Sequence, residues 1–384
     1  QASAVVHKGL FYVGLRPEQY VGTAGQETAV NVLVVDWDSQ PVPRQEVQVV
    51  FAEHNWFSVQ KQAEDGSYST FARGGPTALI TTALSRLGRT LEDPQVAAGL
   101  KYLADQKQPD GGIYQKDSRY RNYETCLAVM CLAEANKDGR YDDLLSRADK
   151  YLKGIQFDGE EGHDRDSVAF GGSGYGGNER PDLSNTAFLV DALRSCGNAA
   201  DSQAIQNALV FVSRCQNFES EFNTTPNAGK VNDGGFYYTA AAGGASPAGQ
   251  EGAEGLRSYG TMTYAGLKSL LFAGLTEDDP RVKAAVGWIA KNYRLDQNPG
   301  MGNAGLYYYY HTFAKCLDTL GQDTIADADG KEHHWRAELA NHLIGEQQED
   351  GSWVNSNTKW LEGDPNLATG FALLSLSHCK PKAE

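Results

Sequence analysis

The sequence predicts a mainly α-helical protein, an α/α toroid of alternating inner and outer helices, preceded by a short β-sandwich-like segment. Three observations lead to this prediction. The hydrophobic period changes from strand-like to about 3.6 residues near Gly75, two kinds of helix then alternate, and a glycine-rich turn recurs between them. We therefore expect two domains, a β segment at 1–72 and the toroid at 73–384.

The strand signals lie in the first segment. Its β-branched and aromatic runs are separated by Gly22, Gly25, Pro41 and Pro43, which are turn-forming residues. The runs are Leu10–Leu15, Ala29–Val35 and Glu46–Phe51. An immunoglobulin-like sandwich is the natural interpretation of this pattern.

The same segment, at about 5–65, resembles a macroglobulin domain of bacterial alpha-2-macroglobulins. The likeness lies in Arg16-Pro17-Glu18 and in Asp36-Trp37-Asp38 followed by Pro41-Val42. It covers less than a complete domain, and a sandwich without all its strands has open edges that attract a partner. The resemblance implies self-association through these strands or packing on the helical body. We expect a periplasmic or extracellular location, with a cytoplasmic one as the alternative.

From Gly75 onward, one class of predicted helix is apolar and rich in small residues. A helix that is apolar all round must be buried, so these helices are expected to line the inside of a ring. They are Thr77–Leu87, Tyr123–Ala135, Leu183–Cys196, Tyr259–Ala273, Leu306–Leu320 and Leu367–His378.

A second class is amphipathic and charged, as expected of an outer layer. Its members are Pro94–Gln106, Asp142–Ile155, Ser202–Cys215, Pro280–Tyr293 and His334–Gln347. Turns such as Asp110-Gly111-Gly112, Asp233-Gly234-Gly235 and Asp350-Gly351-Ser352 follow several of them, where glycine supplies the positive φ that ends a helix.

The segment Gln348-Glu349-Asp350-Gly351-Ser352-Trp353 is similar to the QW repeat of squalene and oxidosqualene cyclases. The relation extends to protein prenyltransferase β-subunits, and it covers about 74–380. It implies a toroid with a central cavity whose ligand is an apolar small molecule or a peptide.

A second likeness lies in Arg180–Ala187, which reads Arg-Pro-Asp-Leu-Ser-Asn-Thr-Ala. This segment resembles the Pro-Asp-x-Asp-Asp-Thr-Ala signature of class II terpene cyclases, whose central acid protonates the substrate. Here Ser184 occupies the place of that acid and Asn185 replaces its neighbour. The resemblance therefore implies the fold of a cyclase without its usual proton donor.

The ends of the inner helices are expected to surround the cavity and to contribute polar and aromatic groups. The candidate lining residues are Ser184, Asn185, Tyr237, Tyr259, Tyr264, Tyr308, His311 and Asn366. Three acids are candidates for a substitute catalytic role: Glu124, Asp182 and Asp364. Alternatively, each of these acids caps its own helix, and we favour that interpretation.

Composition excludes several classes of function. A net charge of −15 disfavours nucleic-acid binding, which needs clustered lysine and arginine. No apolar run approaches the roughly 18 residues of a membrane-spanning helix. The six cysteines include no Cys-x-x-Cys pair, and the places of the prenyltransferase zinc ligands, near Gly305 and Asn366, lack those ligands. We expect no metal, no cofactor and no thioester.

Two function classes stay open. The first is a non-catalytic binding or assembly protein, which we favour. The second is an isoprenoid cyclase or related enzyme with a non-standard acid.

Overall fold

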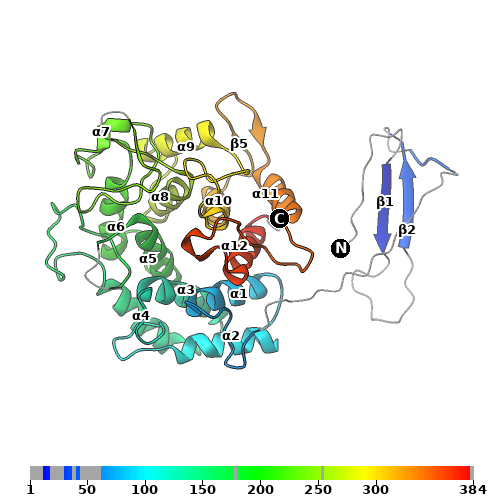
Figure 1. Ribbon diagram of the computed structural model, residues 1–384, viewed down its shortest axis with the longest axis horizontal. Coiled ribbons are helices and arrows are strands. Elements are labelled where there is room, and N and C mark those ends of the chain that lie inside the picture. The colour runs from blue at the N-terminus through cyan, green and yellow to red at the C-terminus, as the bar shows by residue number, and fades with distance from the viewer. Residues whose placement is uncertain are drawn as a thin grey trace. The chain divides into compact units, whose positions relative to one another are not determined.

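A computed structural model describes residues 12–17, 30–36, 40–43, 62–176, 180–251 and 255–380. The chain divides into two compact units, Gln1–Asn55 and Trp56–Glu384 (Figure 1). Residues 62–73 belong to the second unit, where Tyr68 is buried and donates its backbone N–H to Thr77 Oγ1. The helical unit therefore includes a turn that precedes its first helix.

The described part of the first unit is a two-stranded antiparallel sheet. Strand β1 (Tyr12–Pro17) pairs with β2 (Val30–Val35) in a register that runs from Tyr12 opposite Val35 to Pro17 opposite Val30. The predicted strand Glu46–Phe51 lies outside the described residues. The likeness to a macroglobulin domain and the expected self-association stay predictions.

Six helices of the second unit form a closed inner ring. They are α1 (Gly74–Arg86), α3 (Arg121–Ala135), α5 (Leu183–Ser195), α8 (Gly260–Phe272), α10 (Leu306–Leu320) and α12 (Pro365–His378). Each packs against the next in this order, and α12 closes the ring on α1 (Figure 1). The predicted toroid is confirmed, with the inner helices where the sequence placed them.

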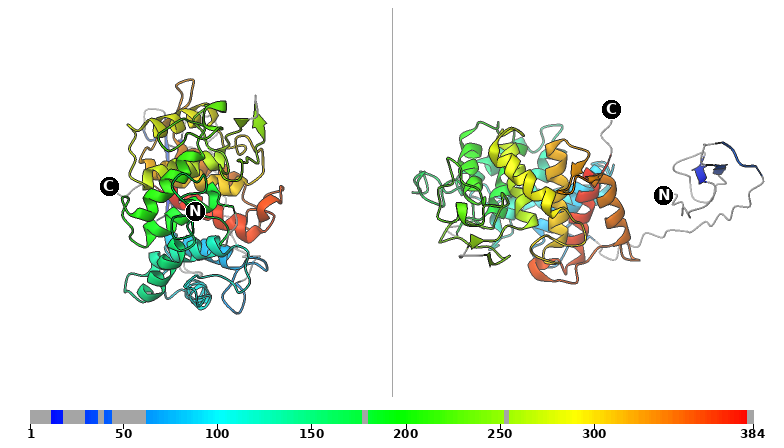
Figure 2. Two further views of the ribbon diagram at one scale, coloured as in Figure 1. Left: turned by 90° about the vertical axis from the view of Figure 1, so that its left-hand side faces the viewer. Right: turned by 90° about the horizontal axis from the view of Figure 1, so that it is seen from above.

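Five helices form the outer layer, each packed against inner helices (Figure 2). They are α2 (Pro94–Asp105), α4 (Asp142–Lys153), α6 (Gln203–Arg214), α9 (Pro280–Asn292) and α11 (Trp335–Gly345). Smaller elements lie in the connections: α7 (Ala228–Val231), β3 (Gln250–Glu251), β4 (Gly255–Leu256), β5 (Ile325–Ala326), β6 (Glu332–His333) and a 3₁₀ turn at Lys359–Leu361. The alternation of inner and outer helices is also confirmed.

Burial follows the two helix classes. Residues 183–193 of α5 are buried without exception, whereas α4 buries only Leu145, Ala148 and Leu152. A helix buried on all sides needs an apolar, small-residue sequence, while an outer helix needs only one apolar stripe. The sequence of a helix therefore predicts whether the helix belongs to the inner or the outer layer.

One turn recurs in front of the inner helices. In each copy an aspartate Oδ1 accepts the backbone N–H two residues later, and the glycine between them has a positive φ. The pairs are Asp65 and Ser67, Asp110 and Gly112, Asp233 and Gly235, and Asp350 and Ser352. The aspartate fixes the turn and glycine tolerates its left-handed backbone.

A threonine in the first turns of an inner helix holds the segment that precedes the helix, both at these four turns and at Ser173 before α5. Its Oγ1 accepts the backbone N–H of a residue in the turn, in five of the six inner helices. The pairs are Thr77 with Tyr68, Thr125 with Ile113, Thr186 with Ser173, Thr263 with Phe236 and Thr369 with Trp353. The repeat is thus a hydrogen-bonded unit of turn and inner helix.

Replacement of Thr263 by valine tests this bond, because the two side chains have nearly the same shape. The Phe236 N–H is buried and would lose its acceptor at 3.1 Å. We expect the free energy of unfolding to fall by about 1–3 kcal/mol, measured by urea denaturation. Thr319→Val is the control, since the Thr319 hydroxyl donates to the Lys315 carbonyl within its own helix. Equal losses in the two variants would contradict the role of the bond.

Candidate functional site

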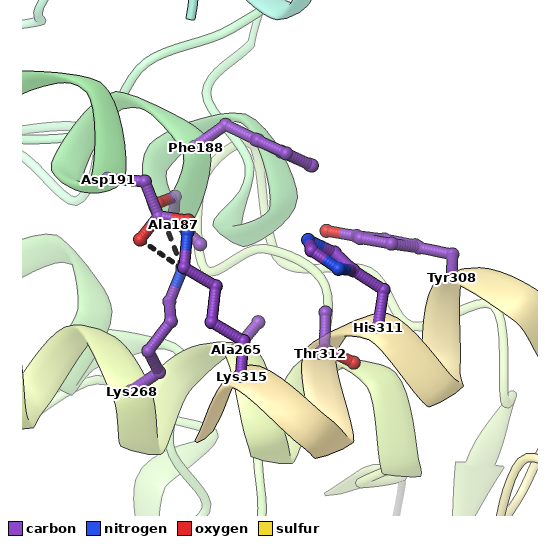
Figure 3. A pocket seen from close by; sticks show the side chains of 9 residues that line it. All are labelled: Ala187, Phe188, Asp191, Ala265, Lys268, Tyr308, His311, Thr312 and Lys315. Carbon is purple, nitrogen blue, oxygen red and sulfur yellow. Dashed lines mark hydrogen bonds and ion pairs between the residues drawn. The ribbon is translucent and has the colours of Figure 1, made fainter. Parts of the chain in front are cut away.

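A small pocket lies among three neighbouring helices of the inner ring, α5, α8 and α10 (Figure 3). It encloses about 10 Å³, which is room for about one water molecule. The lining residues are Ala187, Phe188, Asp191, Ala265, Lys268, Tyr308, His311, Thr312 and Lys315. Three of them are charged, so this pocket is not wholly apolar.

The charged residues form a buried cluster around one carboxylate. Lys268 Nζ lies 2.6 Å from Asp191 Oδ1, and Lys315 Nζ lies 2.6 Å from Asp191 Oδ2 (Figure 3). The exposed fractions of the side chains are 2% for Asp191, 5% for Lys268 and 16% for Lys315. Each helix of the pocket thus contributes one charged group.

The cluster stays ionised because its members compensate one another. Burial alone would raise the pKa of Asp191, but the ammonium groups of Lys268 and Lys315 hold it below its ordinary value. Burial lowers the pKa of Lys268 to about 8, against the attraction of Asp191. At neutral pH Asp191 is therefore a carboxylate that holds two cations, and it has no proton to donate.

His311 lies beside this cluster on α10 and is neutral. Its side chain is buried, and burial together with the positive charge of Lys315 keeps its pKa well below the ordinary value. The ring packs on Phe371, with 5.5 Å between the centroids. Among the described residues, its Nδ1 atom has no hydrogen-bond partner.

Ser184, at the place of the expected acid, sits between two tyrosines. Its Oγ lies 2.8 Å from the hydroxyl of Tyr123 and 2.8 Å from that of Tyr308. Phe188 stacks on Tyr308 with 5.8 Å between the centroids and an interplanar angle of 16°. Tyr123 meets the same phenylalanine edge-on. Hydroxyl and aromatic groups therefore surround Ser184.

The Asp182 carboxylate accepts two hydrogen bonds in the first turn of α5. Its Oδ1 accepts the Asn185 N–H at 2.9 Å, and its Oδ2 accepts Asn185 Nδ2 at 2.8 Å. Burial raises the pKa of this carboxyl to about 6, although these bonds oppose the shift. Asn185 in turn accepts a bond from Asn122 Nδ2 on α3 at 3.2 Å. Asp182 is an N-cap that ties two inner helices together.

Glu124 and Asp364 also serve local structure. Glu124 accepts the Gln115 N–H and the Ser118 hydroxyl, both at 2.7 Å, and burial raises its pKa despite these bonds. Asp364 accepts the Asn366 N–H at 2.9 Å as the N-cap of α12, and it also bonds the Ser69 hydroxyl. None of the three carboxyls, those of Glu124, Asp182 and Asp364, lines the pocket.

The other predicted lining residues divide between the pocket and the surrounding core. Tyr308 and His311 line the pocket. Tyr237 donates its hydroxyl to the Arg214 carbonyl on α6 at 2.7 Å, and Tyr264 packs against Phe313. The remaining members of the set, Ser184, Asn185, Tyr259 and Asn366, are buried in the core but do not line the pocket.

The charged cluster was missed in the sequence, although a signal for it exists. Asp191, Lys268 and Lys315 each stand in an inner helix, with mainly apolar residues on either side in the sequence. Because a charged residue is almost never fully buried unless it is paired, an acid and two lysines in buried helices indicate an ion cluster. The sequence does not show that these three residues meet, because their contact depends on how the inner helices close into a ring.

Within the described ranges, no group of three or more histidine, cysteine, aspartate or glutamate side chains is placed to hold a metal ion. The six cysteines are free thiols. None of the described helices has the length and apolar character needed to cross a membrane.

The comparisons with known proteins agree with the ring. Residues 72–240, which include α1 to α7, match the family model of the squalene-hopene cyclase C-terminal domain. The chain is thus similar to these cyclases over that range and carries a terpene-cyclase-like toroid. No curated protein sequence matches the chain.

Two solved structures of the type II terpene cyclase MstE from Scytonema, both of variant proteins, are also similar. The complex with geranylgeranyl dihydroxybenzoate, the substrate, has 14% identity and a TM-score of 0.33, covering 83% of this chain and 93% of that one. The complex with merosterolic acid A, the product, has 14% identity and a TM-score of 0.32, covering 83% and 91%.

Proposed function

We propose that this chain is a ligand-binding protein on a terpene-cyclase-like toroid, without the proton donor of a cyclase. The observation that carries the proposal is the site of Ser184, whose hydroxyl is held between Tyr123 and Tyr308. A serine hydroxyl is far too weak an acid to protonate an alkene. Binding needs only the pocket, whereas cyclisation needs the acid as well.

The chemistry of the pocket supports the same conclusion. Protonation of an alkene requires a carboxylic acid that stays neutral in an apolar site and points at the substrate. Asp191 is the carboxyl group that lines this pocket, and its two lysine partners keep it ionised. A carbocation would also be repelled by the ammonium groups of Lys268 and Lys315.

The size of the pocket argues against a long isoprenoid. Sites for drug-sized ligands enclose about 300–1,000 Å³. The enclosed volume of about 10 Å³ lies far below this range and offers no room for a chain of squalene length. The ligand is therefore expected to be small.

A second candidate function is a cyclase that uses Asp182. One observation favours it, because burial raises the pKa of this carboxyl to about 6 and leaves part of it protonated near neutrality. Against it, both oxygens of Asp182 are engaged with Asn185. We prefer the binding function for this reason.

Incubation of the purified full chain with squalene or geranylgeraniol, followed by gas chromatography and mass spectrometry, separates the two functions. We expect to recover only the unreacted isoprenoid. A cyclised product that is formed by the wild-type protein and lost in Asp182→Asn would contradict the proposal and establish the second function. Circular dichroism of the variant controls for loss of the fold.

A further inference from the structure

The end of the ring at which the inner helices begin carries a row of aromatic side chains. Phe71, just before α1, lies 6.3 Å from Tyr120, just before α3, measured between the ring centroids. The Tyr120 ring lies 5.9 Å from that of Tyr175, which precedes α5. The Tyr175 hydroxyl lies 3.3 Å from the hydroxyl of Tyr238, in the connection that leads to α8. We call these four residues the aromatic row.

The connection to α12 adjoins this row and exposes two further apolar side chains. The Ser69 hydroxyl bonds the Phe71 carbonyl at 3.2 Å and also the Asp364 carboxylate. The Asp364 N–H in turn donates to the Leu361 carbonyl at 2.9 Å. The exposed fractions are 57% for Phe71, 46% for Trp360 and 41% for Leu361. Large apolar side chains that gather in water on neighbouring loops mark an interaction site.

The same loops hold most of the left-handed backbone found outside glycine. Five of the seven non-glycine residues with positive φ in the described ranges lie in them: Ser69, Ala72, Asp117, Trp360 and Leu361. Such conformations are strained, and they cluster where a protein binds a partner or a ligand. The strain therefore supports a binding role for this end of the ring.

The aromatic side chains are flanked by exposed cations, which are Lys116, Arg119, Arg121, Arg180 and Lys359. The Arg180 guanidinium lies 6.0 Å from the centroid of the Tyr238 ring. The Lys359 ammonium lies 4.7 Å from the centroid of the Trp360 ring. Residues 115–121 carry three cations and one acid, although the whole chain has a net charge of −15. The surface therefore suits a partner with negative charge.

The composition of this surface is that of a protein interface. Tyrosine, tryptophan, phenylalanine and arginine are the residues enriched at interfaces and at their hot spots. A long polyanion, such as a nucleic acid or an acidic polysaccharide, would extend beyond the cations and be repelled by the acidic remainder of the chain. A short peptide segment with a few acidic residues avoids this repulsion.

We infer that the aromatic row, together with Trp360, is a docking surface for an acidic peptide segment of another protein. The apolar side chains of the peptide lie against Phe71 and Trp360, and its carboxylates pair with Arg121 and Arg180. None of the docking residues lines the pocket, so the inference goes beyond the proposed binding function and does not rest on it.

Selection from a phage-displayed library of random dodecapeptides on the purified full chain tests the inference. We expect enriched peptides that combine aspartate or glutamate with aromatic residues or leucine. The affinity of the most enriched peptide, measured by fluorescence anisotropy, should fall at least tenfold when salt is added, because exposed charges are screened. No enrichment, enrichment of basic peptides, or tighter binding of an oligonucleotide or polygalacturonate would overturn the inference.

Variants locate the surface. Phe71→Ser, and the pair Arg121→Gln with Arg180→Gln, should each weaken binding of the selected peptide at least tenfold. The matched controls stand after α1, at the opposite end of that helix: Leu87→Ser, at a residue that is 44% exposed, and Arg89→Gln, at a side chain that is 61% exposed. Unchanged affinity in the first two variants, or an equal loss in the controls, would refute the assignment.

Trp360→Gly separates docking from folding. Glycine adopts the φ of 56° at this position without strain, so the variant should remain folded, as checked by circular dichroism. It should nevertheless bind the peptide at least tenfold more weakly. A folded variant with wild-type affinity would remove Trp360 from the surface and contradict the inference. A cyclised isoprenoid product, by contrast, would overturn the proposed function and leave the docking surface untouched.

Discussion

Replacement of Asp191 by asparagine is expected to lower the free energy of unfolding at pH 7 by about 3–5 kcal/mol. The variant would leave Lys268 and Lys315 buried together with no negative charge between them. A loss of this size is a large share of the stability of an ordinary domain. Urea denaturation followed by circular dichroism measures it.

The loss should become smaller as the pH rises. Burial already lowers the pKa of Lys268 to about 8 in the wild-type protein, and removal of Asp191 lowers it further. Between the lowered pKa of the variant and about 8, the folded variant binds fewer protons than the folded wild type, so the stability of the variant rises more steeply with pH. We therefore expect a smaller difference from wild type at pH 9 than at pH 7.

A triple variant separates the charge from the packing. Asp191→Leu combined with Lys268→Met and Lys315→Met replaces the cluster with apolar side chains of similar volume. Its stability should equal or exceed that of the wild-type protein, because no desolvated charge remains. A single-variant loss below about 1 kcal/mol, typical of an exposed ion pair, would show that the cluster is solvated. A loss that grows with pH would contradict the assigned charges.

The ring was predictable from the sequence because its information is local. The helix Leu183–Ser195 has apolar residues on all its faces, whereas Asp142–Lys153 has them along one stripe, so the sequence of each helix indicates its layer. The Asp-Gly turns mark where one repeat unit ends. The alternation of layers and turns then indicates a ring of paired helices.

The site was less predictable because its contacts join helices that are far apart in the sequence. Asp191 and Lys315 are 124 residues apart, and no periodic pattern records their meeting. The aspartates that looked catalytic, Asp182 and Asp364, stand at helix starts, where a cap and an active-site acid have the same sequence signature. Only the direction of the side chain distinguishes them.

Glu362 is another residue whose contacts lie far away in the sequence. Its replacement is expected to have the second large effect on stability. This buried residue precedes α12, yet its carboxylate accepts the backbone N–H groups of Tyr307 and Tyr308 in the first turn of α10, at 3.2 and 2.8 Å. It also accepts Asn355 Nδ2 at 2.6 Å. The helix has no cap of its own, since Gly305 precedes it with φ of 65°. A carboxylate that is remote in the sequence therefore accepts the N–H groups at the start of a helix that contributes four of the nine lining residues of the pocket.

Glu362→Ala is expected to lower the free energy of unfolding by about 3 kcal/mol, because several buried donors lose one charged acceptor. Glu349→Ala, in an exposed turn, is the control and should change stability by less than about 0.5 kcal/mol. Denaturation by urea compares the two variants. Equal effects would contradict the capping role.

Glu362→Gln should cost less than the alanine variant, and its cost should shrink as the pH rises. Burial raises the pKa of Glu362, although the N–H groups of Tyr307 and Tyr308 oppose the shift. A carboxyl with a raised folded-state pKa contributes most stability below its unfolded pKa of about 4.3 and loses it as the pH passes through the folded value. Glutamine does not titrate, so the free energy of unfolding of the wild type falls toward that of the glutamine variant as the pH rises.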